Sequence, residues 1–369
     1  DFGNKPIIKH KIDMKKLLFM MAVAMAVVSC KKDDKVVGKD KDGKELIVNE
    51  KGDTVAKTET TDSLKVAEKP AEPEVVAITK GADDKYAYKY NLEIGKTYPM
   101  TLGIKTTHTA SDGKESQKMS SESKKQIDYT VKDFKDGVYT LEVKSKQYSE
   151  KMTDPSGKSI SYDTNAAKPA NKDIAVSWSI YKAMTGKTYT MKVDQKGKVV
   201  SVDGLEGIKT SILNSVKKQV SAEEFKFFTQ IIDNSLNKQA ISSQFEETMN
   251  IFPNKTLALK ESWSDSQKID QGPMKGNISM KRTLASVEPV NTTITVNGTQ
   301  SLKGNESQQG VTMSANSSAN VDGKILLDTK SGWINKVNLT KKETLKRTVE
   351  AQGQKQTMTE SVTTVTTVN

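Results

Sequence analysis

The sequence predicts a mainly β protein of the α+β class, with long, curved antiparallel strands in two β-rich halves and a central unit of about three short helices. Tyr139, Leu141 and Val143 alternate with polar residues, which is typical of a half-buried strand. Between residues 205 and 252 the apolar period changes to that of a helix. Many segments between turn signals exceed ten residues, so we expect long, bent strands in a half-barrel-like arrangement.

Length and composition exclude several classes of function. The 369 residues, 35% of them hydrophobic, are enough to bury a sizeable core. Basic residues outnumber acidic ones by 57 to 46, but only Arg282 and Arg347 are arginines. Arginine is the residue that clamps phosphate bidentately and reads guanine, so we expect no nucleic-acid partner. A single cysteine, Cys30, excludes an intramolecular disulfide and a cysteine-based metal site, and we expect no metal and no cofactor other than a covalent lipid.

Residues 14–29 have the features of a lipoprotein signal peptide. Two lysines precede an apolar stretch of 13 residues that ends at Ser29, too short for the roughly 20 residues of a membrane-spanning helix. The sequence Val-Val-Ser-Cys ending at Cys30 resembles a bacterial lipobox, which implies a diacylglycerol on the Cys30 sulfur and an acylated new N-terminus. Residues 1–13 precede the plausible initiator Met14, and we interpret them as an upstream extension of the gene model.

The residues that follow Cys30 resemble the export signal of Bacteroidota surface lipoproteins, a cysteine, any residue, a lysine and two acidic residues. Lys32, Asp33 and Asp34 match these places. The resemblance implies a lipid-anchored protein of the outer membrane, displayed on the cell surface, with a periplasm-facing location as the alternative. Residues 30–84 are rich in Lys, Asp, Glu and Thr, which predicts a lipidated, charged, flexible tether.

Residues 85–369 are predicted to form the β-rich body. Turn dipeptides of the kind that close antiparallel hairpins punctuate it. They are Asp112-Gly113, Asp136-Gly137, Lys196-Gly197, Asn297-Gly298 and Asp322-Gly323. The sequence Gly-Lys-Thr-Tyr, which begins at Gly95 and again at Gly186, lacks the earlier glycine of a Walker A loop. We interpret both copies as glycine turns that lead into strands.

The helical unit spans residues 205–252. Ser221–Glu224 and Ser243–Glu246 are predicted to be capping boxes that start the second and third helices, and Pro253 is predicted to end the third. The apolar face of the second helix needs a cover, so its residues would form either a lid over the concave face of the sheet or a part of the core. These residues are Phe228, Ile231 and Ile232.

The order of these parts resembles a family of uncharacterised Bacteroidota lipoproteins. The residues that carry the resemblance, beyond the lipobox and charged tether, are Gly95–Tyr98, Phe252–Lys255 and Glu261–Trp263. The resemblance implies an architecture, and the family has no assigned activity. Where the family pattern has a glycine before Glu-Ser-Trp, this chain has Lys260.

No catalytic residues are predicted. The sequence contains no Gly-x-Ser-x-Gly elbow and no His-Glu-x-x-His helix. His108, the one histidine beyond the signal peptide, lies in a Thr-rich segment typical of an exposed strand position. We therefore expect a protein that is not an enzyme.

Long strands curving around amphipathic helices predict a binding or carrier module for an apolar small molecule, by analogy with half-barrels that carry lipids. The alternative is a structural or interaction module at the cell surface that contacts polysaccharide or another envelope protein. Trp178, Trp263 and Trp333 are candidates for stacking on sugars, although each is more typical of a core residue.

Overall fold

A computed structural model describes residues 46–48, 54–56, 76–113, 115–271, 274–308, 311–351 and 354–369. The predicted signal peptide, Cys30 and the Lys32, Asp33 and Asp34 motif lie outside these described residues. The chain divides into two compact units, one of which runs from Ser29 to Val75. The described part of that unit is one antiparallel pair, β1 (Leu46–Val48) and β2 (Thr54–Ala56).

The other unit contains Val76–Asn369, so it begins inside the range predicted to be tether. Its main sheet has twelve antiparallel strands. In chain order they are β5 (Thr97–Ser111), β6 (Ser116–Lys135), β7 (Val138–Thr153), β8 (Ser159–Asp163), β9 (Thr188–Asp194), β10 (Val199–Asp203), β12 (Ser262–Gln271), β13 (Met274–Val287), β14 (Asn291–Gln308), β15 (Val311–Asp328), β16 (Ile334–Ala351) and β17 (Gln354–Val368).

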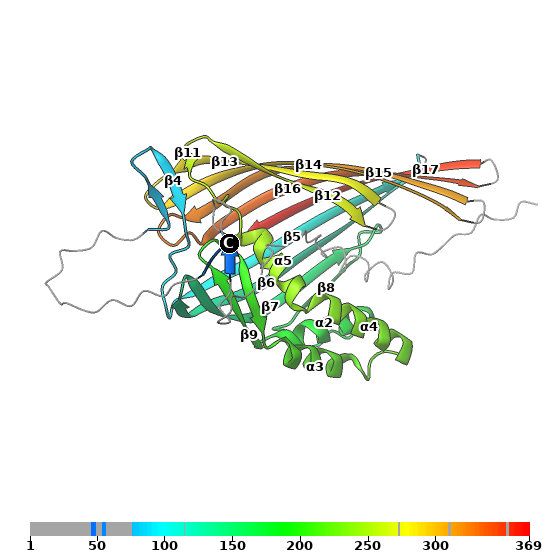
Figure 1. Cartoon of the computed structure of the whole chain (residues 1–369). Coiled ribbons are helices and arrows are strands. Elements are labelled where there is room, and N and C mark those ends of the chain that lie inside the picture. Colours follow the sequence, from blue (N-terminus) through cyan, green and yellow to red (C-terminus); the bar gives the residue numbers. More distant parts are fainter. Residues whose placement is uncertain are drawn as a thin grey trace, which may run out of the picture. The chain divides into compact units, whose positions relative to one another are not determined.

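Eleven of these strands follow one another across the sheet in the order β10-β9-β7-β6-β5-β17-β16-β15-β14-β13-β12, and β8 pairs with the far part of β7. The sheet curls but does not close, because β10 and β12 each have a free edge (Figure 1). A second sheet consists of β3 (Ile78–Lys80), β4 (Lys85–Tyr88) and β11 (Leu257–Ala258). The prediction of a mainly β fold with long, curved antiparallel strands is confirmed.

The central helical unit is also confirmed. It consists of α3 (Leu205–Val216), α4 (Ala222–Ser235) and α5 (Lys238–Met249). Ser221 and Glu224 form the predicted reciprocal capping box of α4. The second predicted capping box is wrong, because α5 starts earlier, with the Asn237 side chain accepting from the Ala240 N–H. Ser243 lies inside α5 and donates to the Gln239 carbonyl instead.

One helix was not predicted, α2 (Lys172–Met184), which precedes the glycine turn at Gly186. It packs against α3, β7 and β8. The described helices include none long and apolar enough to cross a membrane.

Three predicted turns close hairpins as expected. Asp112-Gly113 joins β5 to β6, Asp136-Gly137 joins β6 to β7, and Lys196-Gly197 joins β9 to β10. Asp136 and Gly137 both have positive φ values, 52° and 77°, which is the backbone of a tight primed turn. The glycines at 95 and 186 have φ values of 84° and 80° and lead into β5 and β9, as expected for turns.

The other two predicted turns are wrong. Asn297-Gly298 lies inside β14 and Asp322-Gly323 inside β15, and Asn297 faces Asp322 across the pair. A Cβ on Gly298 would collide with the Met280 sulfur, and one on Gly323 would collide with the Asn338 carbonyl oxygen. These glycines therefore permit close approach of neighbouring strands instead of a reversal of the chain.

The turn before β12 has a glycine-like backbone at Lys260, the position where a glycine was expected. Lys260 has a φ of 69°, the left-handed region that favours glycine. Its N–H donates to the Leu284 carbonyl at 2.8 Å, and its Nζ donates to the Ala285 carbonyl at 2.6 Å. A lysine thus occupies a glycine-like turn and contributes a side-chain hydrogen bond.

We call the face of the main sheet that carries the core its inner face. A cross-strand row of paired residues marks this face, and we call it the core row. It consists of Leu284, Ile294, Ile325, Val337, Val368, Leu102, Lys125 and Tyr148. Paired residues project to the same side of a sheet, so the inner face can be followed along each strand from this row.

The core row divides the strands into two parts. In the near half, the inner face packs against α5 and the core aromatic residues, with the rings of Tyr129 and Phe245 5.8 Å apart. Trp333 contacts Tyr98 and Tyr129 in the same core. The far half contains the parts of β5–β7 and β12–β17 on the other side of the row, toward the β5–β6 hairpin. Figure 1 shows the strands of this half extending beyond the helices.

Candidate functional site

The inner face of the far half carries apolar side chains that are only partly covered. Leu302 of β14, Leu345 of β16 and Val362 of β17 are half-buried. Their neighbours on the outer face, such as Lys303 and Thr344, are polar and exposed. The described helices contact the sheet mainly at β7, β8 and β10. The same strands therefore present a polar outer face and an inner face of mixed apolar and polar side chains that no described helix covers.

A half-buried carboxylate network interrupts these apolar side chains. The Glu343 carboxylate accepts hydrogen bonds from the Ser317 hydroxyl at 2.6 Å and the Gln300 amide at 3.1 Å. The Lys341 ammonium lies 2.8 Å from its other oxygen. Burial raises the pKa of Glu343, but the bonds from Lys341 and Ser317 outweigh burial and lower this pKa below its usual value. The network therefore holds a charged, fully paired carboxylate.

A second buried carboxylate, Glu360 of β17, lies diagonally from the first. One of its oxygens is 2.9 Å from His108 Nε2, and the other is 3.1 Å from an Arg347 nitrogen. His108 was expected to be exposed, and this expectation is wrong, because 21% of its side chain is accessible and it lies on the inner face. The pairing of β5 with β17 joins two residues that are 252 positions apart.

These charges form paired groups and do not converge on a reactive centre. Arg282 of β13 is likewise paired with Asp265 of β12. His108 Nδ1 is buried and has no hydrogen-bond partner in the described part of the chain. Within that part, no group of three His, Cys, Asp or Glu side chains could hold a metal ion. The arrangement can neutralise charge inside an apolar surface, which suits binding better than proton transfer.

The three residues predicted to form a lid or core lie on α4. Phe228 and Ile232 are buried, with 8% and 7% of their surface exposed, and Ile231 is half-buried. Ile232 belongs to the main hydrophobic core. Helix α4 packs on α3 and α5, so these residues are brought together with the helical unit and not with the far half of the sheet.

Two of the three tryptophans are core residues. Trp263 and Trp333 are 8% and 4% exposed, which leaves no face for a sugar. Trp178 of α2 is half-buried and donates its indole N–H to the Asp163 carbonyl at 3.0 Å.

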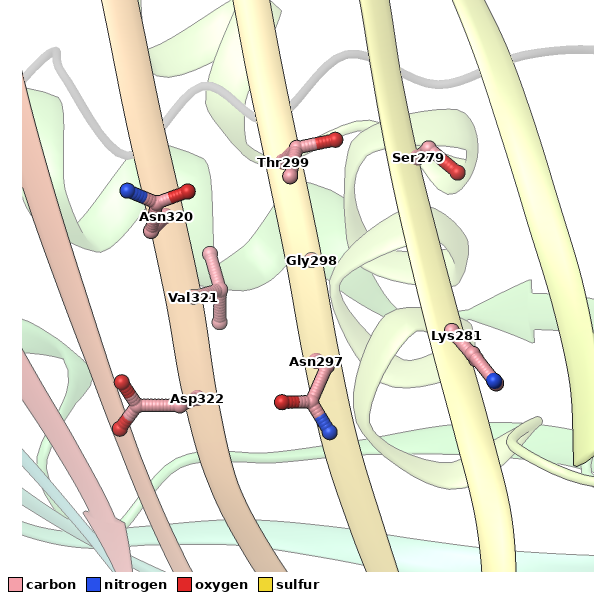
Figure 2. A pocket seen from close by; sticks show the side chains of 8 residues that line it. All are labelled: Ser279, Lys281, Asn297, Gly298, Thr299, Asn320, Val321 and Asp322. Carbon is pink, nitrogen blue, oxygen red and sulfur yellow. The ribbon is translucent and has the colours of Figure 1, made fainter.

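A shallow hollow lies mainly on the outer face of β13, β14 and β15, around the glycine that was predicted to form a turn. Figure 2 shows its lining residues Ser279, Lys281, Asn297, Gly298, Thr299, Asn320, Val321 and Asp322. Lys281, Asn297 and Asp322 form one cross-strand row here. The hollow is lined mainly by polar residues and is open to solvent.

Comparison with known proteins places the chain in a family. The model of a family of unknown function, DUF6263, matches residues 136–334, which is more than half of the chain. The chain belongs to this family. The DUF6263 region runs from the start of β7 to the start of β16 and includes all four described helices.

No curated protein sequence matches the chain. Among solved structures, one described as lipid–protein interactions in lipovitellin is 9% identical, with a TM-score of 0.35 over 74% of this chain and 25% of that chain. The chain thus spans about a quarter of the lipovitellin chain. A mutant Rh. blastica porin is also 9% identical, with a TM-score of 0.15 over 73% of this chain and 100% of that chain. TM-scores this low define no common fold.

Proposed function

We propose that this DUF6263 protein is a non-enzymatic envelope module that binds an apolar ligand on the inner face of the far half. One observation carries the proposal. Leu302, Leu345 and Val362 remain half-exposed on the inner face, whereas the outer face of the same strands is polar. Apolar surface left in water costs about 25 cal/mol per Å², so a bound apolar molecule that covers these residues gains free energy.

Retention of a ligand tests this proposal directly. The purified chain is extracted with organic solvent, and the extract is analysed by mass spectrometry for lipid in stoichiometric amount. Leu345→Gln places an amide on the inner face and should reduce the bound lipid, whereas Thr344→Gln alters the neighbouring outer-face position and should not. A chain that carries no lipid and binds no added lipid would contradict the proposal.

The second part of the proposal is the anchor. Lipidation of Cys30 would hold the chain at a membrane, and the Lys32, Asp33 and Asp34 motif would direct it to the surface of the outer membrane. The short apolar stretch and the lipobox support this part. Cys30→Ala should release the protein from the membrane fraction. Protease added to intact cells should remove the chain while a periplasmic control survives, and protection until the outer membrane is broken would place the chain inside.

An interaction module for polysaccharide or another envelope protein is the second candidate. Three apolar side chains at the end of the far half favour it, because they are more exposed than Leu302, Leu345 and Val362. These more exposed residues are Met313, Val349 and Met358, with 51%, 39% and 40% of their surface exposed. Substituting all three with Ser should abolish capture of a partner from envelope extracts while leaving bound lipid unchanged, if this candidate is correct.

A further inference from the structure

Lys125 is the only charged side chain in the core row. Its partners across the sheet are Leu102 on β5 and Tyr148 on β7. The row residues on the other side of Leu102 are apolar, and all of them are at most 5% exposed: Leu284, Ile294, Ile325, Val337 and Val368. A lysine thus continues a row of buried aliphatic residues on the inner face.

The surroundings of this lysine are apolar on both sides. Leu102 and Ile127 pack against the main core, whereas Tyr148 belongs to a second apolar cluster with Tyr162 and Ile174. Lys125 therefore lies where the two clusters meet, at the border of the far half. Lys125 is half-buried, and burial lowers the pKa of its ammonium group because no paired carboxylate offsets the loss of hydration.

The other charged side chains that the structure describes on the inner face have partners. Glu343 pairs with Lys341, Glu360 pairs with His108 and Arg347, and Arg282 pairs with Asp265. Glu150, which is near the core row on β7, accepts from the Tyr162 hydroxyl at 2.8 Å. Among the described residues, Lys125 has no ion pair and no side-chain hydrogen bond.

An unpaired charge in apolar surroundings is costly, and a bound anion would remove that cost. We infer that Lys125 binds the anionic end, a carboxylate or a phosphate, of an amphipathic ligand whose apolar chain lies along the inner face of the far half. The inference rests on the proposed function and names the chemical class of its ligand.

Binding of matched probes to the purified full chain tests the inference. The probes are palmitate, the uncharged hexadecanol of equal chain length, and a short-chain phosphatidylglycerol that is dissolved as a monomer and not present as vesicles. Lys125→Met keeps the apolar stem and removes the charge, Lys125→Arg keeps a cation, and Lys105→Met removes an exposed outer-face lysine of β5 as the matched control.

We expect Lys125→Met to weaken anion binding about tenfold to a hundredfold, the range for a hydrogen bond to a charged group. Hexadecanol binding should be unchanged, and Lys125→Arg and Lys105→Met should bind like the wild type. Loss of palmitate alone identifies a carboxylate ligand, and loss of phosphatidylglycerol alone identifies a phosphate ligand. In a lysine ¹³C NMR titration, the pKa of Lys125 should be low in the free chain and should rise when the anion binds.

Two outcomes separate this inference from the proposed function. If the wild type binds palmitate and hexadecanol equally, and Lys125→Met weakens the binding of neither palmitate nor phosphatidylglycerol, the inference fails while the proposed function stands. If the wild type binds none of the probes, both fail. Urea unfolding checks that Lys125→Met is folded. A Lys125 pKa that changes neither on addition of palmitate nor on addition of phosphatidylglycerol overturns the inference without any variant.

Discussion

The near and far halves of the main sheet share strands, faces and alternation, but they differ in what lies on the inner face. In the near half, the inner face packs into the main core, and residues such as Ile294 are fully buried. In the far half, residues in equivalent positions on the same strands, such as Leu302, are half-exposed and alternate with paired charges. Alternation thus sets which face is apolar, while the packing of other elements decides whether that face stabilises the fold or remains free to bind.

The largest expected effect comes from truncating one residue in each half of β14, both on the inner face. Ile294→Ala should lower the free energy of unfolding by about 2–5 kcal/mol, because it opens a cavity in a packed core. Leu302→Ala should cost about 1 kcal/mol or less, because its side chain keeps part of its contact with solvent. Urea unfolding of the two variants measures the difference, and equal losses would mean that the two halves are packed alike.

A smaller effect is expected from the paired charges of the far half. Glu360→Gln keeps the shape of the side chain but removes the charge that His108 and Arg347 face, and should cost about 1–3 kcal/mol. Glu350→Gln, on the exposed outer side of β16, is the matched control and should be nearly neutral. If Glu360→Gln is also neutral in urea unfolding, the inner-face pairs add nothing to stability.

Two glutamates should give opposite dependences of stability on pH. Burial raises the pKa of Glu150, so its contribution is fully present below the unfolded pKa of about 4.5 and is lost as pH rises through the folded pKa. The pKa of Glu343 is lowered, so its contribution is present above about 4.5 and is lost as pH falls through the folded pKa. Glu150→Gln should therefore reduce the fall in unfolding free energy as pH rises above about 4.5. Glu343→Gln should reduce the fall in unfolding free energy as pH drops below about 4.5. If both variants altered the unfolding free energy in the same pH range, this assignment would be contradicted.

The smallest expected effect concerns the backbone of the near half. Lys260→Gly relieves the left-handed backbone conformation before β12 but loses the side-chain hydrogen bond to the Ala285 carbonyl. Because the first effect outweighs the second, we expect the free energy of unfolding to rise by about 0.5 kcal/mol. Thermal unfolding should show a slightly higher midpoint. A lower midpoint would mean that the lysine side chain contributes more to the turn than its backbone costs.

The local parts of the fold could be predicted from the sequence. Period-2 alternation located the strands, and the capping box at Ser221 located α4, because both signals involve residues close together in the chain. The turn predicted at Asn297-Gly298 is wrong, because the glycine is needed to make room for the Met280 side chain. Met280 lies on the neighbouring strand, so no local sequence signal shows this. The start of α5 was misplaced because Ser243 and Glu246 have the spacing of a capping box, whereas the Asn237 cap comes earlier.

The candidate site could not be predicted, because its pairs join distant segments. Nothing near His108 in the chain indicates that Glu360 will lie 2.9 Å away. Lys125 could not be predicted either, because nothing near it in the chain distinguishes it from the many surface lysines. Only the strand register places it in the core row. One signal was present: Lys125 follows the alternation of inner-face positions through Ile127 and Tyr129 on β6.

The central position of β17 has a consequence for the order of folding. This strand is the last described one, yet it joins β5 to β16, and two backbone hydrogen bonds between Asn369 and Thr101 hold its end. Until residues 354–368 are available, the strands from each side remain as two separate sheets with exposed edges. Such long-range pairing closes large loops and is slow. The edges of β5 and β16 therefore stay unpaired in a newly made chain until β17 is available.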